Sequence, residues 1–266
     1  MSLSDPPRSH TNPLASIPQP SAPPSGATGV LACVEVGASS QQTAVLDRDG
    51  SFSFHSGIAV PPAVPVLAAV PGLIRGTHVV AASNLGWFDV AASTALGLDR
   101  PVALLRNDAE AAALGEHVLR GATTDLVYVG LGTGVGGAVV RTSSGQVTVT
   151  ANLFGHTDGF SERQCRCGSR GCLETVASGW ALSDPATDDE LHLTAAAVAR
   201  AVELEPLATA RLVVLGGGLT RRHPRLVDWV AACLPDRVIE PSAAPPAAKS
   251  AAAWGLLALH GPPHQP

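Results

Sequence analysis

The sequence predicts an α/β fold, and three observations support this prediction. Residues 30–54 hold short apolar runs separated by turn residues, which is typical of antiparallel strands. From residue 102 onward, apolar runs of strand length alternate with stretches of helical periodicity. Hydrophobic residues make up 45% of the 266 residues, enough for a core in one large or two modest domains. Hairpins combined with strand–helix alternation indicate an α/β protein with two lobes.

The first half of the chain begins with a segment, residues 1–27, whose Pro and Ser content predicts a disordered tail. Strands are then expected from their apolar runs, with a hairpin signal at Arg48-Asp49-Gly50. An amphipathic pattern predicts a helix over residues 86–98. The expected strands are 30–36, 42–47, 51–54 and 66–70.

The second half alternates strands with helices. The clearest helix is 109–120, which is rich in alanine, can be capped by Asn107 or Asp108, and ends before Gly121. His117 is expected on its surface. The other expected strands are 102–105, 126–129, 135–141 and 212–215, and the other expected helices are 175–182, 189–204, 223–234 and 249–260.

Composition excludes several classes of function. The net charge is −5 and no basic run is present, so no direct binding of nucleic acid is expected. No apolar stretch reaches membrane-spanning length, and no secretory leader is apparent. Five cysteines, three of them clustered, favour a metal site plus two separate thiols over a disulfide framework. A cytoplasmic location is therefore expected.

One segment has the composition of a zinc site. His156, Cys165, Cys167 and Cys172 lie within seventeen residues, and glycines between them permit tight turns. One imidazole and three thiolates form a tetrahedral donor set that zinc prefers. Four protein ligands leave no open position, so a structural role is expected rather than a catalytic one.

Two glycine-rich loops follow predicted strands. Residues 130–137 contain a formal G-x-G-x-x-G, but the β-branched residues after it favour a strand over the helix that a dinucleotide fold requires. A tight turn whose N–H groups and Thr133 hydroxyl hold a phosphate is one interpretation, and a plain glycine hairpin is the other. Gly216-Gly217-Gly218 can likewise approach a nucleotide closely or form a simple turn.

Two carboxylates stand at strand ends. Asp108 lies where a predicted strand meets a helix; with Asn107 it is either a capping pair or a general base with an orienting amide. Glu35 ends the first apolar strand, and is either a solvated residue or part of a metal–phosphate site.

These motifs together resemble the ROK family of repressors, open reading frames and kinases. The resemblance covers roughly residues 29–260 and lies in Gly155-His156, the Cys165–Glu174 signature and several motifs in family order. Those further motifs are Val70-Pro71-Gly72, Ser83-Asn84-Leu85-Gly86-Trp87, Asn107-Asp108-Ala109 with Gly115-Glu116, Leu131-Gly132-Thr133-Gly134 and Leu215-Gly216-Gly217-Gly218.

The resemblance implies an actin-like, hexokinase-type fold of two ribonuclease H-like lobes with a cleft between them. It implies an ATP- and Mg-dependent kinase of a small-molecule sugar, with Asp108 as general base and a structural zinc. Sugar contacts would come from Asn107, His156, Glu174, Asn84 and Gly72. ATP would be held by Gly132, Thr133, Gly134, Gly216, Gly217, Gly218, Glu35 and Gly37. The sequence leaves open whether the chain forms a homodimer.

The chain departs from the kinase pattern in places. Glu35 and Ala38 replace an Asp and a Gly of the first phosphate motif, and Leu153 replaces a sugar-binding Glu. Residues 50–71 and 179–212 are shorter than the family's usual elements, so both lobes are expected to be shortened. The expected division is a lobe at 28–105, a lobe at 106–260 with the zinc loop at 155–174 and a last helix that can pack back on the first lobe, and a tail at 261–266.

Two functions remain open from the sequence. One is a sugar kinase, with altered or reduced activity. The other is a catalytically inactive sugar-binding sensor related to ROK repressors, without their DNA-binding domain, because residues 1–27 are too short and proline-rich for a winged helix. A small zinc-knuckle nucleic-acid module fits poorly, since the chain is acidic and poor in aromatics.

Overall fold

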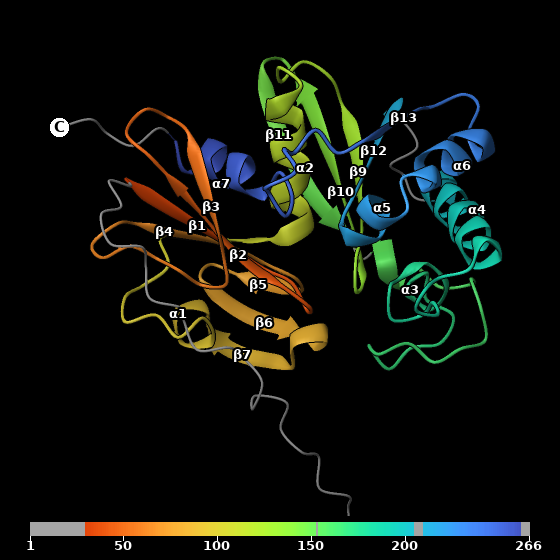
Figure 1. Cartoon of the computed structure of the whole chain (residues 1–266), viewed down its shortest axis with the longest axis horizontal. Coiled ribbons are helices and arrows are strands. Elements are labelled where there is room, and N and C mark those ends of the chain that lie inside the picture. Colours follow the sequence, from red (N-terminus) through yellow and green to blue (C-terminus); the bar gives the residue numbers. More distant parts are fainter. Residues whose placement is uncertain (1–29, 153, 205–209, 262–266) are drawn as a thin grey trace, which may run out of the picture.

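The computed structural model describes residues 30–152, 154–204 and 210–261. The expected tail at 1–27, the position of Leu153 and most of the expected tail at 261–266 therefore lie outside the described residues. Two sheets form two lobes, and helices α2 and α7 lie between them (Figure 1).

The first lobe is built on a five-stranded sheet. Its strand order is β3-β2-β1-β4-β8, with β1, β2 and β3 antiparallel and β1, β4 and β8 parallel. Central β1 and β4 are almost wholly buried, as their continuous apolar runs predict. No helix occurs in the segment 57–65 between β3 and β4, so this crossover is short. The strands are β1 (Leu31–Val36), β2 (Gln41–Leu46), β3 (Phe52–Ser56), β4 (Val66–Val70) and β8 (Leu104–Asn107).

The second lobe repeats the same topology. Its strand order β11-β10-β9-β12-β13 has the same pattern of three antiparallel and then two parallel strands. Two copies of one strand order make the fold a duplicated, two-lobed α/β architecture. The strands are β9 (Leu126–Leu131), β10 (Val135–Ser143), β11 (Gln146–Asn152), β12 (Leu212–Gly216) and β13 (Val238–Pro241).

The predicted helix over 86–98 is wrong for most of its length. Residues Trp87–Ala91 form β7, which pairs with β6 (His78–Ala82) in a small sheet that also contains β5 (Leu73–Arg75). Gly86 adopts a left-handed φ of 68° and ends the short 3-10 helix η2 (Ser83–Leu85). Aromatic and β-branched side chains then favour extended backbone, and only α1 (Ala92–Ala95) is helical.

The two lobes are joined by crossing helices. Helix α2 (Asp108–Leu119) packs against α7 (Ala252–His260), and α7 also contacts β1, β4 and β8. The crossing is close because glycines lie at its contact points: a Cβ added to Gly115 would lie 1.8 Å from the Ala251 carbonyl oxygen. A Cβ on Gly255 would lie 1.9 Å from the Ala111 oxygen. Alanine-rich and glycine-containing faces therefore let two helices approach between the lobes.

Three further helices belong to the second lobe. Helices α4 (Asp188–Leu204) and α6 (Arg225–Cys233) pack together, and α3 (Glu174–Ala177) packs on α4. Helix α3 is shorter than the predicted 175–182 because Ser178 is already extended. His117 is buried rather than on the surface of α2, with its Nδ1 3.0 Å from the Thr124 carbonyl oxygen. Within the described ranges, no helix has both the length and the apolar character to cross a membrane.

Candidate active site

The N-terminus of α2 carries the Asn107-Asp108 pair. The Asn107 Oδ1 accepts hydrogen bonds from the N–H groups of Ala109 at 3.0 Å and Glu110 at 3.2 Å, so Asn107 is the N-cap. Its Nδ2 donates to the Gly72 carbonyl oxygen at 3.0 Å. The capping and site interpretations are thus compatible, because one amide both caps the helix and holds the turn after β4.

Gly72 is required at that turn. Its φ is 102°, and an added Cβ would lie 2.1 Å from the Ala81 carbonyl oxygen. The small sheet of β5, β6 and β7 therefore approaches the N-terminus of α2 through a position that accepts only glycine.

Asp108 is electrostatically unusual. Burial raises the pKa of its carboxyl group from 3.8 to about 6; Lys249 opposes this shift and the negative charge of Glu35 adds to it. The Ala109 N–H donates to Asp108 Oδ1 at 2.9 Å. A carboxylate with a pKa just below neutral pH is well matched to accepting a proton from a hydroxyl group.

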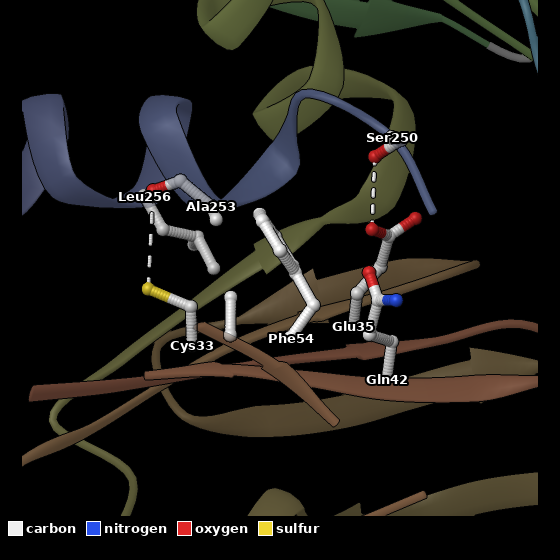
Figure 2. Close-up of a pocket in the computed structure, with 8 residues that line it drawn as sticks. Cys33, Glu35, Gln42, Phe54, Ser250, Ala253 and Leu256 are labelled. Atoms are coloured by element: carbon white, nitrogen blue, oxygen red, sulfur yellow. Dashed lines mark hydrogen bonds between the residues drawn. The ribbon is translucent and has the colours of Figure 1, made fainter. Parts of the chain in front are cut away.

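Glu35 and Gly37 lie at the end of β1, and Glu35 is not simply solvated. The Lys249 ammonium donates to Glu35 Oε1 at 3.1 Å, and the Ser250 hydroxyl donates to Oε2 at 2.9 Å. Figure 2 shows Glu35 and Gln42 on the sheet, facing Ser250 on the segment before α7. Glu35, Gln42 and Ser250 line the polar side of a small pocket. Its apolar side is lined by Cys33, Phe54 and Leu256.

The glycine loop of the second lobe lies between β9 and β10. The structure confirms that a strand follows it, so the dinucleotide-fold interpretation does not apply. The Gly132 N–H donates to the Gly134 carbonyl oxygen at 2.9 Å, which closes the turn. The Thr133 hydroxyl donates to the Ser39 hydroxyl at 2.9 Å, so the turn of the second lobe meets the turn after β1 of the first.

The second glycine loop, Gly216-Gly217-Gly218, runs from β12 into α5 (Gly218–Arg222). A Cβ on Gly216 would lie 2.6 Å from the Tyr128 hydroxyl oxygen. Gly217 has a φ of 94°, and its added Cβ would lie 2.3 Å from the Leu131 carbonyl oxygen. The loop is therefore a closely packed turn against β9 rather than a flexible one.

Glu174 is buried at the start of α3. The Val135 N–H donates to its Oε1 at 2.9 Å, and the Trp180 indole N–H lies 3.4 Å from its Oε2. A Cβ on Gly134 would lie 2.4 Å from Glu174 Oε1 and 2.8 Å from Asn84 Nδ2. Gly134 thus lies close to two of the predicted sugar contacts, Glu174 and Asn84, and the buried Asn84 Oδ1 has no hydrogen-bond partner among the described residues.

The four predicted metal ligands converge. The ligand atoms of His156, Cys165, Cys167 and Cys172 all lie within 4.8 Å of one another. The Cys165 Sγ is 3.7 Å from His156 Nδ1, and the Cys167 and Cys172 sulfurs are 3.7 Å apart. Zinc–sulfur bonds of about 2.3 Å at tetrahedral angles place two sulfurs about 3.8 Å apart, so the donor set fits zinc.

Backbone hydrogen bonds connect this cluster to Glu174. The Cys165 N–H donates to the Ser169 carbonyl oxygen at 2.7 Å, and the Leu173 N–H donates to the Thr157 oxygen at 2.9 Å. Gly168 and Gly171 have φ values of 94° and 75°, which glycine adopts at low cost. The loop therefore ends one residue before Glu174, whose backbone position depends on it.

The structure also brings in residues that sequence motifs did not single out. Ser39, Trp180, Lys249 and Ser250 all contact a predicted site residue. Of these, Lys249 had a signal in the sequence, because it is the only lysine in the chain.

The duplicated sheets and the central helix crossing define the actin-like, two-lobed fold of the hexokinases. The chain belongs to the ROK family, whose model matches residues 60–212. A ROK glucokinase from Streptomyces griseus, solved in complex with glucose and AMPPNP, superposes with a TM-score of 0.62 at 23% identity, covering 87% of this chain and 99% of that one. A ROK hexokinase from Thermus thermophilus gives 0.59 at 20% identity, with 87% and 99% covered.

Curated relatives include sugar kinases. An N-acetylmannosamine kinase of Escherichia coli is 28% identical over 58% of this chain. A kanosamine kinase of Amycolatopsis mediterranei is 29% identical over 75% of this chain and 76% of its own length. The chain spans 62% of that E. coli kinase and 38% of a Haemophilus influenzae N-acetylmannosamine kinase.

Proposed function

We propose that this protein is a sugar kinase that transfers the terminal phosphoryl group of ATP to a hydroxyl group of a hexose or amino sugar. The observation that carries the proposal is Asp108. Its carboxyl group has a raised pKa of about 6, lies at a helix N-terminus, and is under the electrostatic influence of Glu35 and Lys249. As a carboxylate, Asp108 would take the proton of the sugar hydroxyl as that oxygen attacks phosphorus.

The sugar end of the site is formed by residues from both lobes. Asn107 and Gly72 place the turn after β4 beside Asp108. The unpartnered Asn84 Oδ1 supplies an acceptor for a sugar hydroxyl near Glu174, and His156 lies on the loop that leads to Glu174. Both oxygens of Glu174 already have protein donors, so this residue can accept further hydrogen bonds only with its remaining lone pairs. The names of the relatives support a hexose or amino sugar as the class of substrate.

The phosphate end is formed by the turns that face each other at Ser39 and Thr133. Gly132, Gly134 and Gly37 lack Cβ atoms, so the backbone of these turns would let phosphate oxygens approach closely, and Gly216 to Gly218 would border the nucleoside. Glu35 is the carboxylate of this end that would help to hold Mg²⁺, which would supply positive charge to the phosphate oxygens. A Streptomyces griseus glucokinase of the same fold was solved with a nucleotide analogue, which supports a nucleotide as the phosphoryl donor.

We also propose that His156, Cys165, Cys167 and Cys172 hold a structural zinc. The donor chemistry and the 3.7 Å separations support it. With four protein ligands, the metal would stabilise the loop that positions Glu174 and would take no part in phosphoryl transfer.

The test is ADP release by the full chain with MgATP and a panel of hexoses and amino sugars. At least one sugar should stimulate ADP release, and Asp108→Asn should lower the rate of that release by about 100-fold or more. The matched control is Asp189→Asn, since Asp189 also lies in the first turn of a helix but is exposed. Sugar-induced thermal stabilisation without ADP release from any sugar would overturn the kinase proposal in favour of a non-catalytic sugar-binding protein.

A further inference from the structure

Lys249 is the single lysine in the chain, and the other 16 basic residues are arginines. Its side chain is 18% exposed, and its ammonium group lies 3.1 Å from Glu35 Oε1. It is also the positive charge that opposes the upward shift in the pKa of Asp108. The only lysine is therefore paired with Glu35 and also acts electrostatically on the proposed general base.

The backbone of Lys249 is held from two directions. Its N–H donates to Gln42 Oε1 of β2 at 2.6 Å, and the Gln42 amide donates in turn to the Ala247 carbonyl oxygen at 2.8 Å. The Arg221 guanidinium of α5 donates to the Lys249 carbonyl oxygen. Contacts to both lobes fix the base of the side chain, so its ammonium is presented from a preorganised position.

The ammonium also lies against the turn after β1. A Cβ added to Gly37 would be 2.7 Å from Lys249 Nζ, so the absence of a side chain at residue 37 makes room for it. The Gly37 N–H donates to the Ser40 carbonyl oxygen at 2.8 Å, and this turn carries Ser39, which contacts Thr133 of the second lobe. The lysine is thus at the meeting point of the two proposed phosphate turns.

We propose that Lys249 is a phosphate-binding residue, whose ammonium contacts the phosphate chain of the bound nucleotide. This inference rests on the proposed kinase function. A lysine ammonium is a compact point charge with three donors, suited to phosphate oxygens. Phosphoryl transfer depends on neutralising charge on those oxygens, and Glu35 alone would repel them. The Ser250 hydroxyl donates to the other oxygen, Oε2, so Glu35 would keep a partner if the ammonium turned toward a phosphate.

A purely structural ion pair is the competing explanation, and nucleotide binding separates the two. The probes are ADP and adenosine, titrated calorimetrically into the full chain without sugar. Lys249→Met keeps a similar length but removes the charge, and should weaken ADP binding by about tenfold or more while adenosine affinity changes less than about threefold. Arg48→Met, at an exposed hairpin residue, is the control and should change neither affinity.

Removing one partner of the pair leaves Glu35 without its counter-charge, so Lys249→Met can lose stability. The double variant Glu35→Gln/Lys249→Met is neutral at both positions and carries the same test if the single variant fails to fold. Its ADP binding should fall by about tenfold or more relative to the Glu35→Gln single variant, with adenosine binding retained.

These results separate the phosphate-binding role of Lys249 from the proposed kinase function. Unchanged ADP affinity in a folded lysine variant, or equal losses for ADP and adenosine, would overturn the phosphate-binding role and leave the kinase assignment intact. Absence of ADP binding and of sugar-stimulated ADP release in the wild-type protein would overturn both.

Discussion

Replacing the proposed general base should make the protein more stable while it removes activity. Asp108→Asn keeps the size of the side chain and an oxygen that can accept the Ala109 N–H, but it removes the charge. In the wild-type protein, the pKa of Asp108 is raised from 3.8 to about 6 on folding. The folded state therefore binds this proton more tightly, and the associated stability is present at low pH and lost as pH rises through 6.

The magnitude follows from that difference in pKa. A shift from 3.8 to about 6 corresponds to at most about 3 kcal/mol of unfavourable free energy for the carboxylate above pH 6. Asp108 is only half-buried, so water screens part of this cost and about 1–2 kcal/mol is expected. For a domain of this size, that gain raises the melting temperature by about 2–8 °C. Loss of the base should lower kcat by about 10²- to 10⁴-fold.

The assay is thermal unfolding of wild type, Asp108→Asn and the exposed control Asp189→Asn, at pH 8 and again near pH 4.5. The Asp108→Asn variant should melt higher at pH 8, and its advantage should shrink toward pH 4.5, where the wild-type carboxyl is largely protonated in the folded state. The control should stay within about 0.5 kcal/mol of wild type at both pH values. A variant that melts at or below the wild-type temperature at pH 8 would refute the electrostatic reasoning.

Three other predictions concern the same site and its supports. The profile of kcat/KM against pH should have an acid limb with an apparent pKa near 6, because only the Asp108 carboxylate accepts a proton; activity that stays level from pH 7 to pH 5 would argue against this base. Cys167→Ser should lose about one zinc per chain in metal analysis and melt at a lower temperature, whereas Cys233→Ser, outside the cluster, should keep its zinc; equal zinc in both would contradict the ligand assignment. Gly115→Ala should destabilise the protein by about 1–3 kcal/mol in denaturant titration, because its Cβ would meet the Ala251 carbonyl oxygen at 1.8 Å, and an unchanged midpoint would show that α2 and α7 can separate freely.

The sequence predicted those features whose residues all lie within a short stretch of the chain. The four metal ligands fall within seventeen residues, and the structure brings them together as their spacing predicts. The cap at Asn107 and the strand after Gly134 were also predicted, since each depends on neighbours a few residues away. The helix predicted over 86–98 failed for a different reason. Pairing with β6 decides the conformation of Trp87–Ala91, and the periodicity of that segment does not reveal its partner.

By itself, the sequence determined the fold class, the zinc-type cluster and the positions of the glycine turns, because these follow from residue type and short spacing. Only the tertiary structure placed Lys249 and Ser250 on Glu35, which is more than 200 residues away in the chain. Only it showed that Ser39 meets Thr133 across the two lobes. Contacts of this kind arise from strand order and from the crossing of α2 with α7, which bring distant turns to one place. The same long-range packing desolvates Asp108 and raises its pKa, so the property that marks Asp108 as a base is a product of the assembled fold.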